Sequence, residues 1–116
     1  MKPIDLTTAL KATDGDFDLL KHVVDAFLEE YPTLMAELEP AILKSDLVVM
    51  QRASHTIKGT LRIFGDVPAQ AFAERLEEMA QSGALNHAQE TFESLRVELS
   101  SMREQLVEAM KDPNQP

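Results

Sequence analysis

The chain contains no cysteine and no tryptophan, and only four of its 116 residues are glycine. The lack of cysteine excludes a disulfide framework, a thiol nucleophile and any zinc site built on thiolates. No apolar stretch approaches the roughly 20 residues that cross a bilayer, and the first residues lack the apolar core of a signal peptide. We therefore expect one globular cytoplasmic domain over residues 1–116, without membrane insertion, whose fold depends on packing alone.

Basic residues are also scarce. Eleven Lys and Arg stand against twenty Asp and Glu, which gives a formal net charge of −9. A protein that binds nucleic acid gains affinity by neutralising phosphates, so this balance argues against nucleic acid as a partner. Histidines and acids show no metal-ligand spacing on one helix face, and we expect neither a metal site nor a bound cofactor.

The composition and the spacing of apolar residues predict an all-α fold. Apolar residues recur every three or four positions, and no segment alternates as a strand would. The expected helices cover residues 4–12, 16–44, 47–64, 66–82 and from about 86 to 110. Four substantial amphipathic helices joined by short links, preceded by one short helix, predict an antiparallel four-helix bundle. The polar tail over residues 112–116 is expected to fray.

Several residues mark the expected helix ends. Asp46 is placed to cap the third helix, and Asn86 with Gln89 has the spacing of a capping box for the last one. Pro32 and Pro40 fall inside the long second helix and are expected to kink it or break its end, because each removes a backbone donor.

The third helix differs from the rest of the chain in charge. Residues 47–65 contain three basic residues and no acid. At about 100° per residue, a group of side chains lies within roughly 60° of His55. This group consists of Val48, Gln51, Arg52, Lys58, Gly59 and Arg62. The opposite side is apolar, so His55 is predicted to point outward from a locally positive face.

Gly59 stands inside this helix, where glycine costs up to about 1 kcal/mol relative to alanine. Its missing side chain would let another protein or a phosphate group approach His55, one turn away. Lys58 can place an ammonium group near an anion on the imidazole. This arrangement permits nucleophilic attack by a neutral imidazole nitrogen on a phosphoryl group.

The segment from Ser54 to Gly65, SHTIKGTLRIFG, resembles the signature of histidine-containing phosphotransfer (HPt) domains, with His, Lys and Gly at this spacing and a second Gly six residues later. Gly15-Asp16 and Leu76-Glu77 resemble further family positions, so the resemblance covers nearly the whole chain. It implies a phosphocarrier that accepts phosphate on His55 from a receiver-domain aspartate and passes it to another response-regulator receiver.

The resemblance also implies roles for the other residues. Lys58 would stabilise the phosphate and Gly59 would admit the partner, while the receiver would bring the Mg²⁺. Upstream, a hybrid sensor histidine kinase is the implied partner, and we expect a monomer. Val48, Gln51, Arg52 and Arg62 are expected to contact the partner, and Glu74 or Glu77 to orient the imidazole if the fourth helix packs alongside. His22 and His87 are expected to be ordinary surface residues.

Two other functions remain open from the sequence. The N-terminal phosphoacceptor domain of chemotaxis-type histidine kinases shares the His-x-x-Lys-Gly motif, although the Gly15-Asp16 opening argues against it. A helical adaptor that carries no phosphate is the third possibility. The sequence also leaves open whether the domain is free-standing or part of a hybrid kinase.

Overall fold

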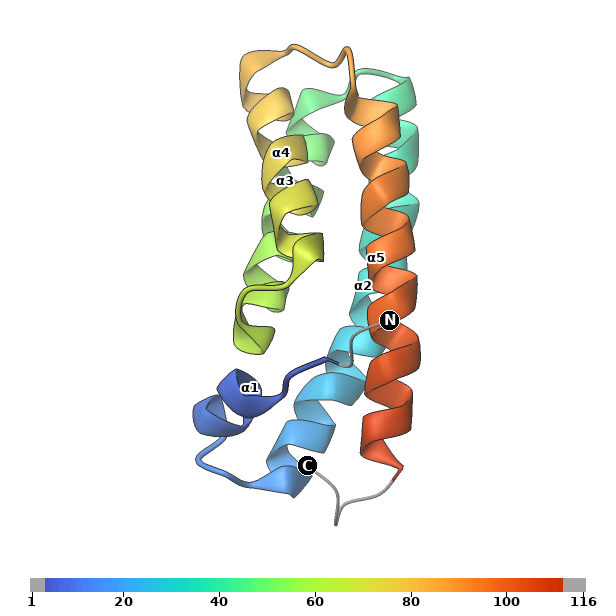
Figure 1. Ribbon diagram of the computed structural model, residues 1–116. Helices are drawn as coiled ribbons and strands as arrows, with labels where there is room; N and C mark the ends of the chain where they lie inside the picture. The colour runs from blue at the N-terminus through green and yellow to red at the C-terminus, as the bar shows by residue number, and fades with distance from the viewer. Residues whose placement is uncertain (1–3, 112–116) are drawn as a thin grey trace.

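Five α-helices and one short 3₁₀ turn make up the computed structural model, which describes residues 4–111. The elements are α1 Thr7–Ala12, α2 Phe17–Leu43, α3 Leu47–Leu61, η1 Arg62–Phe64, α4 Pro68–Ser82 and α5 Ala88–Met110. Successive long helices run antiparallel, as the short links between them require (Figure 1). The predicted four-helix bundle with a short extra N-terminal helix is confirmed. The expected fraying of residues 112–116 lies outside the described residues.

The first and last helices of the four-helix bundle, α2 and α5, are much longer than α3 and α4. Helix α3 packs mainly on α4 and α2, while α4 packs on α5. At 1.5 Å per residue, α2 alone spans about 40 Å, which accounts for the 46 Å long axis of the molecule. Helix α1 lies beyond the ends of α3 and α4 and packs against η1, at the lower end of the bundle in Figure 1.

Side chains at the helix ends explain most of the boundaries. The Asp16 carboxylate accepts a hydrogen bond from the Leu19 amide at 3.1 Å, and Asp46 accepts one from Val49 at 3.2 Å. Each satisfies an amide that has no partner within its helix. Gly83 ends α4 in the left-handed conformation, at φ +76°, which an L side chain rarely adopts. The expected cap at Asp46 is therefore confirmed.

Two expectations about the helix ends are wrong. Helix α1 begins at Thr7 rather than at Ile4, with Leu6 at the N-cap position and the Asp5 carboxylate accepting a hydrogen bond from the Thr7 amide. The second concerns the proposed capping box. The third helical segment does end at Phe64, before Gly65, as predicted, but its last turn is 3₁₀, and this tighter turn brings Phe64 edge-on to Phe27 in the core.

Pro32 and Pro40 lie inside α2, which continues to Leu43, close to the predicted end at residue 44; the kink expected at the prolines stays a prediction. Both prolines of this helix are exposed, so the carbonyl that each leaves unpaired can reach water. The capping box at Asn86 is absent. The N-cap position falls one residue later, at His87, which has no side-chain cap, and α5 begins at Ala88.

Candidate functional site

His55 lies near the middle of α3 on its outer face. The opposite face of α3 supplies fully buried apolar side chains to the core, among them Met50, Ala53 and Ile57. This burial fixes the rotation of the helix, and the His55 side chain is consequently 65% exposed. The outward orientation predicted from helical periodicity is therefore correct.

Glu77 from α4 joins His55 to Lys58. One carboxylate oxygen, Oε2, lies 2.5 Å from His55 Nδ1, and the other, Oε1, accepts a hydrogen bond from Lys58 Nζ at 2.5 Å. Only 9% of the Glu77 side chain is exposed. Helix α4 is the closest packing partner of α3, so this carboxylate is held against α3 by the core on both helices. Glu74, by contrast, is exposed and makes no hydrogen bond with His55 among residues 4–111.

The charge state of Glu77 decides which ring nitrogen of His55 donates the hydrogen bond between them. Burial alone would raise the pKa of this carboxyl, but the hydrogen bonds from Lys58 and His55 outweigh burial and lower its pKa below 4.5. An ionised carboxylate can only accept hydrogen bonds, so the proton between the two side chains belongs to Nδ1. The neutral imidazole then carries its lone pair on Nε2, on the far side of the ring from Glu77.

The ionised Glu77 carboxylate should make the free energy of unfolding depend on pH. The pKa of Glu77 is lower in the folded state than its ordinary value of 4.5. The ionised carboxylate therefore stabilises the folded chain fully above pH 4.5, and this stabilisation is lost as the pH falls from 4.5 through the folded pKa. We expect wild type to lose stability toward acid more steeply than Glu77→Gln, as measured by urea unfolding between pH 6 and 3. Parallel curves would show that the carboxylate contributes nothing to the folded state through its charge.

Lys58 is more enclosed than the sequence suggested. Its side chain is only 16% exposed, with the ammonium group directed to Glu77. An ammonium carries three protons, and one bond to Glu77 leaves two for another acceptor. Lys58 is thus held beside the imidazole and still able to donate.

Gly59 is exposed, and a Cβ atom built on it would meet nothing within 4 Å. Its backbone is an ordinary helical one, so neither a turn nor internal packing requires a glycine there. The other glycines, at positions 15, 65 and 83, all have positive φ. Within residues 4–111, no contact or backbone conformation requires a glycine at position 59.

A shallow groove of about 440 Å³ runs along His55 between α3 and α4. It is lined by Val48, Gln51, Arg52, His55, Glu77 and Gln81. Three of the four residues expected to contact a partner therefore surround the histidine. Arg62 does not line this groove, since it lies beyond the end of α3, in η1, with an exposed side chain.

Two residues of the site were hard to assign from the sequence. Gln81 was missed, although it stands one turn after Glu77 on α4. A sharper signal was available for Glu77, because it shares a helix stripe with Ala73 and Ala80, both buried. An acid in a buried stripe calls for a cationic or hydrogen-bonding partner.

The comparisons with known proteins agree with this geometry. The family model of the Hpt domain matches residues 22–109, which is most of the chain. The fold is similar to the crystal structure of histidine-containing phosphotransfer protein B (HptB) from Pseudomonas aeruginosa PAO1, with a TM-score of 0.85. That similarity covers 93% of this chain and 94% of the other at 20% identity. No curated protein matches the chain significantly.

Among the described residues, no helix is long and apolar enough to cross a membrane. The matches favour a phosphotransfer domain over the chemotaxis-kinase domain and over the adaptor. Hpt domains work in phosphorelays with receiver domains and histidine kinases. In general they carry the phosphoryl group and are not catalysts. An exposed histidine on the third helix of a matching bundle is what such a carrier needs, and the chain belongs to the Hpt domain family of histidine phosphotransfer proteins.

Proposed function

We propose that His55 is the phosphoacceptor, that it takes its phosphoryl group from a receiver-domain aspartate, and that it passes this group to another receiver. The observation that supports this most directly is the contact between His55 Nδ1 and Glu77. It holds the ring in one tautomer with the nucleophilic nitrogen exposed, which is how a neutral imidazole must be presented for attack. A hybrid sensor histidine kinase is the proposed source of the receiver that donates.

In the proposed step, the Nε2 lone pair attacks phosphorus in line with the acyl phosphate bond of the donor. A phosphorus–nitrogen bond forms while the phosphorus–oxygen bond breaks, and the aspartate leaves as a carboxylate. The Nδ1 proton stays in its hydrogen bond to Glu77, which stabilises the positive charge that develops on the ring. Return transfer reverses the same bonds, so the chain ends unchanged.

Lys58 is assigned to the phosphoryl group that His55 carries. Its ammonium group already lies beside the imidazole through the shared carboxylate, and its two remaining protons can bond to phosphoryl oxygens. The Mg²⁺ that neutralises the acyl phosphate is assigned to the receiver. The chain is thus proposed to act as a carrier, with turnover dependent on its partners.

The surface around the histidine suits a receiver. Val48 is 75% exposed at one end of the groove, where it offers apolar contact area. Arg52, Lys58 and Arg62 make this helix the positive region of an acidic protein, and the phosphorylated site of a receiver is negative. We assign Val48, Gln51 and Arg52 to the docking surface and place Arg62 at its edge, with the domain acting as a cytoplasmic monomer.

The choice of donor tests this proposal. The native chain should gain one phosphoryl group, seen as about 80 Da by intact mass, when mixed with a phosphorylated receiver. The modification should be labile to acid and stable to base, as a phosphoramidate is. Phosphorylation by a kinase core with ATP, and by no receiver, would instead indicate the chemotaxis-kinase domain. If neither donor phosphorylates the chain, the result would favour the helical adaptor that carries no phosphate.

Substitution of Gly59 should separate stability from transfer. Gly59→Ala should raise the free energy of unfolding by about 0.5–1 kcal/mol, because alanine restricts the unfolded chain and favours helix. It should also slow phosphoryl exchange about tenfold, equivalent to about 1.4 kcal/mol, because the added methyl group meets the docked receiver. Urea unfolding and single-turnover transfer measure the two effects.

Ser100→Ala is a suitable control, since Ser100 is exposed on α5, far along the chain from α3. It should stabilise the helix by up to about 0.5 kcal/mol and leave transfer unchanged. If Gly59→Ala also leaves transfer unchanged, close approach at this position is not the reason for the glycine.

A further inference from the structure

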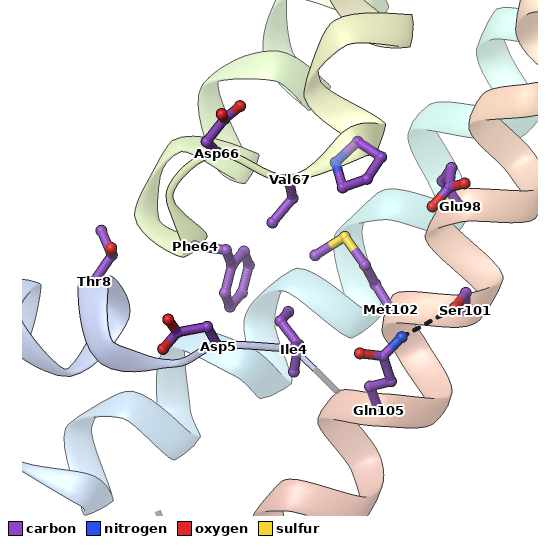
Figure 2. A pocket seen from close by; sticks show the side chains of 11 residues that line it. Ile4, Asp5, Thr8, Phe64, Asp66, Val67, Glu98, Ser101, Met102 and Gln105 are labelled. Carbon is purple, nitrogen blue, oxygen red and sulfur yellow. Dashed lines mark hydrogen bonds between the residues drawn. The ribbon is translucent and has the colours of Figure 1, made fainter. Parts of the chain in front are cut away.

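A second cavity lies at the other end of the α3–α4 pair. It is bounded by α1, by the connection from η1 to α4, and by α5, and it has a volume of about 530 Å³. Figure 2 shows that Phe64, Val67 and Met102 form an apolar floor facing the open space. The volume lies within the range of pockets that bind small ligands, roughly 300–1,000 Å³, so the cavity has room for one or two side chains of a partner.

Three acidic residues line the cavity, with Asp5 and Asp66 on one side of this floor and Glu98 on the other (Figure 2). Within residues 4–111, no lysine or arginine lines the cavity. Asp5 serves the fold, because its carboxylate accepts a hydrogen bond from the Thr7 amide at 2.9 Å. The side-chain carboxylates of Asp66 and Glu98 form no hydrogen bond or ion pair with another residue in the described range 4–111. Negatively charged carboxylates beside an apolar surface repel one another and complement a positively charged occupant.

The cavity is separate from the phosphoacceptor site. No residue lines both this cavity and the groove beside His55. The groove belongs to α3 and α4, whereas the cavity takes its walls from α1, α5 and the loop before α4. A partner could therefore occupy the cavity while a receiver reaches the histidine.

We propose that this cavity docks a basic segment of a partner protein, in which an arginine or lysine stands next to a bulky apolar side chain. The apolar side chain would cover Phe64, Val67 and Met102, and the cation would lie between Asp66 and Glu98. Nucleic acids and anionic membranes carry the wrong charge for this rim. A second copy of this chain is also a poor match, because its net charge is −9. The interaction goes beyond phosphotransfer, since it needs no phosphate on His55.

The test uses the full chain, labelled with ¹⁵N, and an amidated decapeptide of alternating arginine and leucine. We expect the largest amide shifts at Thr8, Val67 and Ser101, with small shifts in the His55 groove. A decapeptide of alternating glutamate and leucine should cause none of them. The double variant Asp66→Asn/Glu98→Gln should weaken binding about tenfold, as expected from the loss of two partly exposed ion pairs.

Glu29→Gln/Glu30→Gln is the matched control, because it removes the same charge from exposed positions on α2. It should change the dissociation constant less than twofold if the interaction is local, which is about 0.4 kcal/mol. Equal weakening by both double variants would show a general attraction to an acidic protein and overturn the proposal. So would shifts confined to the His55 groove, or no shifts at about 1 mM peptide. Transfer to His55 should be unaffected by either double variant, so the proposed function is tested separately.

Discussion

Replacement of His55 by glutamine is expected to abolish phosphorylation of the chain by a phosphorylated receiver. The amide has no lone pair of comparable nucleophilicity, so the rate of transfer should fall by more than about 1000-fold, as happens when other covalent nucleophiles are removed. The fold should survive, because the His55 side chain is 65% exposed and packs little. Intact mass after incubation with the donor measures the label, and circular dichroism checks the helix content.

The chain offers two internal controls for this result. His22 and His87 are both exposed on other helices or at their ends, and His87 even stands near a carboxylate, with 3.7 Å between its Nδ1 and Glu90 Oε2. His22→Gln and His87→Gln should both keep the full label. Persistent label on His55→Gln, or loss of label in either control, would place the acceptor elsewhere.

Replacement of Glu77 by glutamine should have the second-largest effect. The amide keeps the size of the side chain but removes the negative charge that both His55 and Lys58 contact. The tautomer would no longer be fixed, and the developing imidazolium would lose its counter-ion. We expect single-turnover transfer to slow by about 10- to 100-fold, at the lower end of what a positioned proton-transfer group contributes.

Glu74→Gln is the matched control, since it makes the same chemical change one turn earlier on α4 at an exposed side chain. It should transfer phosphate at the wild-type rate. A readout independent of the rate is the ¹⁵N chemical shift of the ring nitrogens, which should report the Nδ1–H tautomer in wild type and a mixture in Glu77→Gln. Wild-type rates and an unchanged tautomer in Glu77→Gln would remove any positioning role for this carboxylate.

The sequence alone predicted the part of the site that lies on one helix. His55, Lys58 and Gly59 are within one turn of each other, and helical periodicity places them on one face without knowledge of the fold. The apolar residues opposite them fixed which side is core. The bundle itself followed from the same periodicity, because four amphipathic helices with short links have few ways to bury their stripes.

The part of the site contributed by α4 was less predictable. Glu74 and Glu77 are three residues apart and so differ by only about 60° around the helix, which leaves both as candidates. The choice between them depends on how α4 is rotated and shifted against α3, and that is decided by the packing of buried side chains such as Leu76. For the same reason Gln81 was not foreseen. The starts of α1 at Thr7 and of α5 at Ala88 were also not predicted, since they depend on local hydrogen bonds.

The bridge between α3 and α4 has a consequence for how such a carrier could be redirected. His55 and Glu77 both stand inside helices that the core holds together, and neither lies on a loop that a partner must order. If His55 is the phosphoacceptor, as proposed, its reactive nitrogen is in position before any encounter, and discrimination between receivers depends on the surrounding surface. Exchange of the side chains at Val48, Gln51 and Arg52 should reroute signalling to a new receiver while the reacting groups stay untouched.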